Sequence, residues 1–171
     1  SFNETLTKKF LEQEASVTEE ELRQVIRQGT IANKMVPLLC GAAFKNKGIQ
    51  KLLDAVVLYL PSPLDLPPAK AHDPEDAVKV MEVPADYRAP LAALAFKVQA
   101  DPHMGKLVYV RVYSGVLETG SYIFNASRRI RERVTKLLRM HANRQEIIDS
   151  VCTGDIAAAV GLKDTKTGDT L

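Results

Sequence analysis

The sequence predicts an α+β chain in which helices come first and an antiparallel β-barrel follows. Three observations support this order. Apolar residues recur every three or four positions up to residue 60, five prolines occur from residue 64 to residue 90, and apolar residues alternate with smaller or polar ones after Pro90. The first pattern is typical of amphipathic helices and the last of strands with one buried face. Prolines interrupt both kinds of element, so the stretch between them marks a boundary.

We therefore divide the chain into a helical part at residues 1–64, a linker rich in proline and acidic residues at 65–89, and a β-barrel at 90–171. With 171 residues, 46% of them hydrophobic, the chain is long enough to bury a core. It begins without Met and ends in Gly168-Asp169-Thr170-Leu171, as if entering a strand. We expect both ends to lie inside a longer protein.

Two N-terminal helices are predicted from spacing and capping. One face of the first helix is apolar and contains Phe2, Leu6 and Phe10. Thr18 and Glu21 have the spacing of a capping box, so a second helix is expected to start after Thr18. Gly29 is the expected C-terminal stop of this helix. Its buried face is predicted to contain Leu22, Val25 and Ile26.

A loop of small residues follows a short apolar run. The run Val36–Leu39 is predicted to be a strand of a parallel sheet in an intact protein. In this chain we expect it to be orphaned, repaired by self-association through exposed apolar surface, or locally altered. The loop Cys40–Gly48 leads into a third helix, Ile49–Leu60, which Pro61 ends. Because Gly and Ala leave the main chain uncovered, N–H groups of this loop can approach a ligand.

Strand candidates separated by turn signals predict the barrel after Pro90. In residues 107–113, Val108, Val110 and Val112 occupy one face, while the other face carries Leu, Tyr and Arg side chains. This two-sided pattern is typical of a barrel strand that is covered on both sides. Further candidates are Ile130–Met140, Ile147–Val151 and Ile156–Val160.

Signatures of metal and phosphate sites are missing from this sequence. No metal site is expected, because zinc-ligand spacing is absent around the three histidines, His72, His103 and His141. The stretch Gly115–Ser121 resembles a P-loop in spacing, but Ser121 stands where Lys is needed. This stretch lies between strand candidates, so a hairpin turn is the favoured interpretation.

The two cysteines are expected to be structural. Cys40 and Cys152 both lie in apolar stretches, which predicts reduced, buried thiols without a disulfide. The sequence around Cys40 contains no signature of a nucleophilic thiol. We therefore expect no catalytic residue in this chain.

Charge is unevenly distributed, although the formal net charge is only +2. Residues 127–144 contain seven Lys or Arg residues and one acid, Glu132. Candidate contacts to an RNA phosphate backbone in this stretch are Arg128, Arg129, Arg131 and Arg133. The inward residues of the same strand are expected to be Ile130, Val134 and Leu138. A solvated, charged rim explains these arginines equally well, and the sequence alone leaves both interpretations open.

Long motifs in both halves resemble the elongation factor G family of bacterial translational GTPases. Val36–Gly48 and the exit Tyr59-Leu60-Pro61-Ser62-Pro63 are similar to the end of that family's GTPase domain. Matches to its second domain are Pro90–Lys97, Arg111–Gly115, Met140–Asn143 and Gly154–Asp164. The resemblance covers essentially the whole chain. It implies the helical tail of a P-loop GTPase α/β domain followed by a translation-factor antiparallel β-barrel.

The resemblance also implies a function and a nucleotide loop. Members of the family are cytoplasmic factors that use GTP, with magnesium, to move tRNA and mRNA through the ribosome. Their last guanine motif corresponds to Gly41, Ala42, Ala43 and Phe44, where the backbone N–H of Ala43 would read the base. The P-loop, the switch regions and Asn-Lys-x-Asp are absent from this sequence. The chain itself is therefore expected to hold no cofactor and to have no GTPase activity.

The implied partners are small-subunit ribosomal RNA and the remaining domains of the same factor, with no membrane contact. Two alternatives stay open. Within the family's relatives, the chain would be part of a ribosomal-protection or release-factor GTPase. Outside them, it would be a stand-alone RNA-binding β-barrel.

Overall fold

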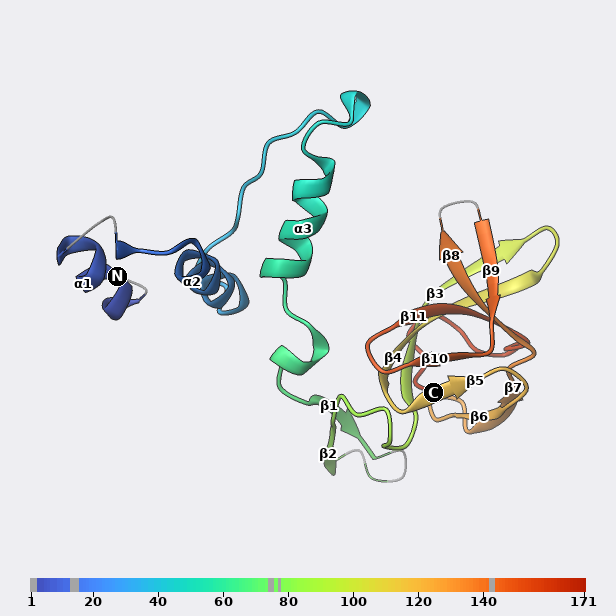
Figure 1. The fold of residues 1–171 in the computed structure, drawn as a ribbon. Coiled ribbons are helices and arrows are strands. Elements are labelled where there is room, and N and C mark those ends of the chain that lie inside the picture. Colours follow the sequence, from blue (N-terminus) through green and yellow to red (C-terminus); the bar gives the residue numbers. More distant parts are fainter. Residues whose placement is uncertain (1–2, 13–15, 74–75, 77, 142–143) are drawn as a thin grey trace. The chain divides into compact units, whose positions relative to one another are not determined.

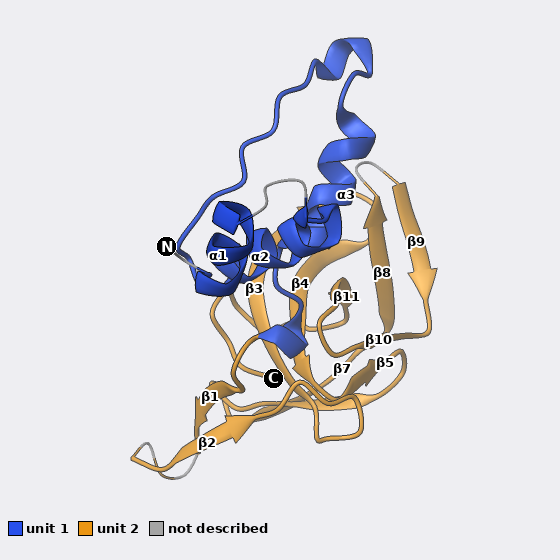
Figure 2. Ribbon diagram, turned by 60° about the vertical axis from the view of Figure 1, so that its left-hand side comes forward, with its two compact units in different colours: residues 1–65 blue, residues 66–171 orange. Residues whose placement is uncertain are grey.

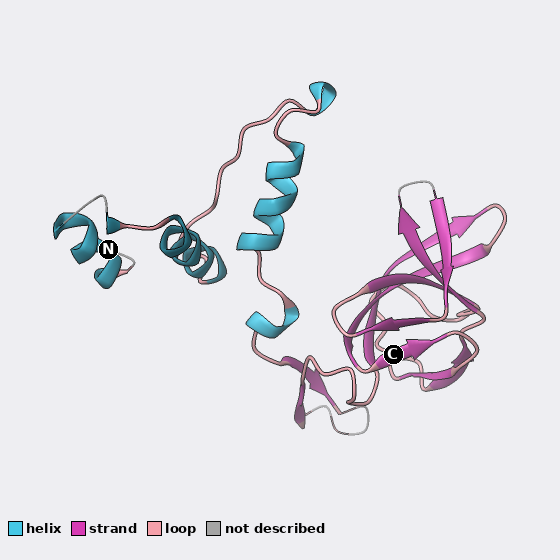
Figure 3. Cartoon of the chain, in the orientation of Figure 1, coloured by secondary structure: helices cyan, strands magenta, loops and turns pink. Residues whose placement is uncertain are grey.

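The computed structural model describes residues 3–12, 16–73, 76, 78–141 and 144–171. The chain forms two compact units, residues 1–65 and 66–171 (Figures 1 and 2). The α-helices occur in the first unit and the strands in the second (Figure 3). This is the α+β class that the sequence predicts. Of the sequence patterns above, Phe2, Pro74, Ala142 and Asn143 lie outside the described residues.

The first unit contains the helices α1 (Glu4–Glu12), α2 (Glu19–Ile31) and α3 (Ile49–Tyr59). The predicted capping box is confirmed, because the N–H of Glu21 donates to Thr18 Oγ1 and the N–H of Thr18 donates to Glu21 Oε2. Lys9 of α1 lies 2.6 Å from the same carboxylate. The hydrogen bonds from Lys9 and Thr18 lower the pKa of Glu21 to about 2. One carboxylate therefore both caps α2 and ties α1 to it.

The expectation that Gly29 ends α2 is wrong. The helix continues to Ile31, and the chain reverses at Asn33, where φ is +54°. The N–H groups of Lys34 and Met35 then donate to the carbonyl oxygen of Gly29. A Cβ at position 29 would lie 3.0 Å from the Met35 side chain. Gly29 permits this close approach, and the flexible Met35 side chain would have to shift by a few tenths of an ångström to admit a Cβ.

The first unit buries few side chains. Among its described residues, only Gly29 and Ala55 are buried. Of the predicted inner face of α2, Val25 and Ile26 are half-buried, but Leu22 is 46% exposed. Polar contacts contribute as well, because Arg27 donates to two carbonyl oxygens at the C-terminal end of α3 and pairs with a carboxylate beyond the helix. These acceptors are Leu58, Leu60 and Asp65.

The second unit begins with a hairpin that the sequence did not reveal. Strands β1 (Ala69–His72) and β2 (Val80–Val83) pair antiparallel, with Ala69 opposite Val83. They lie inside the predicted linker, residues 65–89. Each strand has only four residues and neither shows a strong apolar alternation, so composition signals only the prolines and acids around them.

The remaining strands of the second unit form an antiparallel barrel-like arrangement (Figure 1). A five-stranded sheet has the order β3-β4-β11-β8-β9, and two further pairs are β5–β10 and β6–β7. The bounds are β3 (Ala92–Asp101), β4 (Gly105–Ser114), β5 (Val116–Glu118), β6 (Tyr122–Asn125), β7 (Ile130–Arg133), β8 (Lys136–His141), β9 (Arg144–Ile148), β10 (Ser150–Cys152) and β11 (Ile156–Val160). The last strand matches its prediction. The predicted strands Ile130–Met140 and Ile147–Val151 are each divided, into β7 and β8 and into β9 and β10.

Strand β4 is covered on both faces, as predicted. Its three valines, Val108, Val110 and Val112, are fully buried in the main core. Leu107 on the opposite face packs with Leu138 and Ala158 in a second, smaller cluster. On β3, which pairs with β4, the small residues Ala93 and Ala95 face the core. Small side chains there leave room for the valines of β4.

At Gly161, directly after β11, the chain passes very close to the end of β7, and a substitution there tests this close approach. Its φ is +106°, and a Cβ would lie 2.4 Å from the carbonyl oxygen of Arg133. Gly105 is a matched control, since its φ is +76° but a Cβ there would meet nothing. Both Gly→Ala variants should suffer the cost of a left-handed backbone, and only Gly161→Ala should add a clash.

We therefore expect Gly161→Ala to lower the free energy of unfolding by about 2 kcal/mol more than Gly105→Ala. Urea denaturation followed by circular dichroism measures both values. Equal losses in the two variants would contradict the packing of β7 against the end of β11.

Candidate functional site

The predicted nucleotide loop forms a small closed turn. The N–H of Ala42 donates to Lys47 O at 2.9 Å, and the N–H of Lys47 donates to Ala42 O at 3.1 Å. Between them, Ala43–Lys45 forms the 3-10 helix η2. Ala43 is its first residue, so its N–H has no acceptor within that helix. The Phe44 side chain is fully exposed.

The run before this loop has no strand partner among the described residues. Val36 is 90% exposed and Leu38 is 92% exposed. This outcome agrees with the expectation of an orphaned segment. Apolar side chains on the run, on the loop and on α3 are thus left on the surface of the first unit.

The prediction that the cysteines are buried is wrong. Cys40 and Cys152 are free, as expected, but both are exposed. Cys152 lies on β10, where Val151 takes the inward position and its neighbours point outward. Cys40 follows the exposed run. Apolar neighbours in sequence therefore did not indicate burial at either position.

The four candidate arginines lie at the β6–β7 hairpin but have different roles. Arg128 Nε donates to Asp169 Oδ2 at 2.6 Å and forms an ion pair with it. Arg129 lies in the turn with φ +57° and is exposed. Arg131 and Arg133 lie on β7 and are exposed. The hairpin therefore presents three of the four side chains to solvent.

Glu132 on β7 is an inward residue that was not predicted from the sequence. Val134 and Leu138 are buried as expected and Ile130 is half-buried, but Glu132 also points inward and is only 7% exposed. Its carboxylate accepts hydrogen bonds from the N–H of Asp164 and from Thr165 Oγ1. Because alternate residues of a strand point to the same face, the inward positions 130 and 134 could have indicated that position 132 also points inward.

Glu132 belongs to a buried polar network that joins the β6–β7 hairpin to the end of the chain. Asn125 Nδ2, on a fully buried side chain, donates to Thr165 Oγ1 at 3.1 Å and to Asp169 Oδ2 at 3.0 Å. The N–H of Lys166 donates to Asp169 Oδ2 at 2.9 Å. Burial disfavours the Asp169 carboxylate, but its hydrogen bonds from Asn125, Lys166 and Arg128 outweigh that cost and hold its pKa below the ordinary value.

The network positions the residues that connect β3 to the hairpin. The N–H of Ala95 donates to Asp169 O, and Ala93 and Leu171 exchange two backbone hydrogen bonds, each of 2.9 Å. The N–H of Ala126, just after β6, donates to Thr170 O. Residues 169–171 therefore bridge β3 and the β6–β7 hairpin, and they close this side of the barrel.

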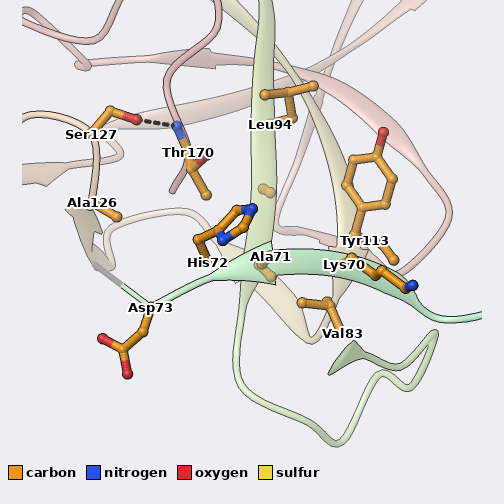
Figure 4. Close-up of a pocket in the computed structure, with 13 residues that line it drawn as sticks. Lys70, Ala71, His72, Asp73, Val83, Leu94, Tyr113, Ala126, Ser127 and Thr170 are labelled. Carbon is orange, nitrogen blue, oxygen red and sulfur yellow. Dashed lines mark hydrogen bonds between the residues drawn. The ribbon is translucent and has the colours of Figure 1, made fainter. Parts of the chain in front are cut away.

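A pocket of about 550 Å³ lies between the β1–β2 hairpin and the barrel (Figure 4). Its volume falls in the range of ligand pockets. The polar residues that line it include Lys70, His72, Tyr113, Ser127 and Thr170. Nothing in the sequence predicted it, because the hairpin itself was not predicted.

Two further chemical features are missing from the described part of the chain. No group of three or more His, Cys, Asp or Glu residues there is arranged to hold a metal ion. No helix there is long and apolar enough to cross a membrane.

Comparison with known proteins identifies the class of this barrel. Residues 105–171 match the family model of Elongation factor Tu domain 2. A crystal structure from Thermus thermophilus has the same fold over 98% of this chain and 22% of its own, with a TM-score of 0.67 and 23% identity. The second unit is thus a translation-factor β-barrel.

Two relatives extend the match to the whole chain. Over 169 residues, 99% of its length, the chain is 56% identical to elongation factor G of Thermotoga neapolitana and equally to that of Thermotoga maritima. The chain belongs to the elongation factor G family of translational GTPases. It spans 24% of the length of these curated relatives.

Asp169 gives a pH-dependent test of the buried network. Because its pKa in the folded state lies below the unfolded value of about 3.9, the carboxylate stabilises the fold above about pH 4. This contribution is lost as the pH falls through the folded pKa. Asp169→Asn should lower the free energy of unfolding by about 1–3 kcal/mol at pH 7, since Arg128 loses its partner.

The same variant should show a smaller loss of stability than the wild type when the pH is lowered below about 4. Denaturation across a pH series measures this difference. Asp149→Asn, at an exposed position, is the control. If the free energy of unfolding changed with pH in the same way in the wild type and in Asp169→Asn, Asp169 would not be the source of this pH dependence.

Proposed function

We propose that the chain works as part of an elongation factor G, which uses GTP to move tRNA and mRNA through the ribosome in the cytoplasm. The observation that carries this proposal is the 56% identity over 99% of the chain to proteins named elongation factor G. In this assignment, residues 1–64 are the C-terminal part of the GTPase domain, residues 65–89 connect it to the barrel and carry the β1–β2 hairpin, and residues 90–171 are its second domain.

The loop is assigned to the base side of a guanine-nucleotide site whose other parts lie on other segments. Gly41, Ala42, Ala43 and Phe44 would form this edge, with the N–H of Ala43 directed to the base. The closed turn and the position of Ala43 at the start of η2 support this role. The chain itself is assigned no catalysis and no bound GTP, GDP or magnesium, because its sequence contains no P-loop and no Asn-Lys-x-Asp.

Nucleotide binding tests this assignment directly. The chain should show no measurable affinity for GTP or GDP at up to millimolar nucleotide, because one backbone donor contributes only about 1 kcal/mol. Isothermal titration calorimetry with magnesium present is the measurement. Micromolar binding would show that the chain carries a nucleotide site of its own and would overturn the division of roles proposed here.

The barrel is assigned contacts to small-subunit ribosomal RNA and to the other domains of the factor. Arg129, Arg131 and Arg133 are exposed at one hairpin, where they can meet phosphate groups. Arg128 is held by Asp169, so its role is to position the hairpin. The exposed apolar surface of the first unit supports a further assignment, self-association when this chain is studied by itself.

A salt series tests the RNA contact. The chain should bind small-subunit ribosomal RNA, with an affinity that falls as salt rises. Arg131→Ala/Arg133→Ala should reduce the salt slope by about 0.7 for each lost contact. Lys8→Ala/Arg23→Ala removes two exposed positive charges from the first unit and should leave the slope unchanged. Filter binding gives the slopes, and identical slopes for both double variants would exclude this hairpin as the contact.

A further inference from the structure

The outward face of the β6–β7 hairpin carries two aromatic and two arginine side chains in a regular arrangement. In the antiparallel register, Tyr122 lies opposite Arg133 and Phe124 lies opposite Arg131. The residues between them point inward, and Ile123 is only 4% exposed. We call these four residues, Tyr122, Phe124, Arg131 and Arg133, the aromatic–arginine ladder.

Both rings of the ladder are available to a partner. Tyr122 is 64% exposed and Phe124 is 48% exposed. The guanidinium of Arg133 lies 5.8 Å from the centre of the Tyr122 ring, within the range of a cation–π interaction. Single exposed aromatic residues are common on protein surfaces, but two that alternate on one strand beside two arginines form a continuous face.

The ladder is positively charged because the acids near it are directed elsewhere. Glu132 is the single acid of residues 127–144, and it points inward to Thr165 and to the N–H of Asp164. Asp169 is engaged by Arg128, Asn125 and Lys166 inside the barrel. The outward positions of β7 therefore present arginine without a carboxylate from the same strand.

We propose that the aromatic–arginine ladder binds unpaired RNA, with bases stacked on Tyr122 and Phe124 and phosphate groups on Arg131 and Arg133. This inference rests on the RNA contact proposed above and names the kind of RNA. Side chains two residues apart on a strand are about 7 Å apart, so each ring can take its own splayed base. Bases in a duplex hide their faces in the stack, and only unpaired bases can use the rings.

The test uses the whole chain and two labelled RNAs, a single strand of about 12 nucleotides and a duplex of the same length. Fluorescence anisotropy at low salt measures both affinities. The chain should prefer the single strand. Tyr122→Leu/Phe124→Leu should weaken that binding by about tenfold or more, because stacking on an aromatic ring is worth about 1–3 kcal/mol per base.

Matched variants separate stacking from other effects. Tyr122→Phe keeps the ring and should retain the affinity of the wild type. Tyr87→Leu is the control, because the Tyr87 ring is 57% exposed and also lies beside a guanidinium, 5.2 Å from Arg88. Leucine preserves apolar character on β6, circular dichroism reports whether the variants fold, and Tyr122→Leu and Phe124→Leu are also measured singly.

Each outcome decides between the two proposals. If the leucine variants bind the single strand as tightly as the wild type, or if the duplex binds equally well, the ladder is not a stacking platform. A loss of affinity in Arg131→Ala/Arg133→Ala alone would then leave the proposed contact to the RNA backbone intact. If the wild type binds neither RNA, the proposed contact and the ladder both fail.

Discussion

The closure of the barrel in the second unit depends on the hydrogen bonds made to the carboxylate of Asp169. Its Oδ2 atom accepts hydrogen bonds from Asn125, Arg128 and Lys166. A buried charge is tolerated only when such donors replace the water that it has lost. In return, the carboxylate fixes the last residues of the chain between β3 and the β6–β7 hairpin, where they supply backbone hydrogen bonds to both. Directional hydrogen bonds therefore close this side of the barrel, next to an apolar core.

The same network determines what the hairpin presents to solvent. Because Glu132 and Asn125 point inward to Thr165, their neighbours on β6 and β7 must point outward. A shift of one residue in either strand would bury arginine and expose the network. The inner polar residues and the outer aromatic and basic residues are therefore two consequences of one register. This coupling explains how a domain of low net charge can display a locally basic surface.

Features that depend on neighbouring residues were predictable from the sequence. The capping box at Thr18, the third helix and the two-sided burial of β4 follow from local spacing, and each is present. Features that depend on distant contacts were not. The helix α2 ends at Ile31, and the chain then reverses at Asn33 so that the N–H groups of Lys34 and Met35 return to the carbonyl oxygen of Gly29. Cys152 is exposed because it points outward on β10, and Cys40 is exposed after a run that has no strand partner among the described residues.

In the candidate site, too, local features were predictable from the sequence and features that depend on distant contacts were not. The basic hairpin was evident from composition, whereas the different role of Arg128 was not, because its partner lies 41 residues away in the sequence. Glu132 was missed because a charged residue at an inward position contradicts the usual pattern of burial. Only the structure shows the donors from residues 164–165 that make this position acceptable.

The role proposed for this chain is that of a segment of a translational GTPase whose barrel contacts the small ribosomal subunit. Cosedimentation of the whole chain with purified small and large subunits tests it most directly. We expect the chain to sediment with the small subunit at low salt and to be released as the salt concentration rises. Failure to sediment with the small subunit, or equal sedimentation with both subunits, would contradict it.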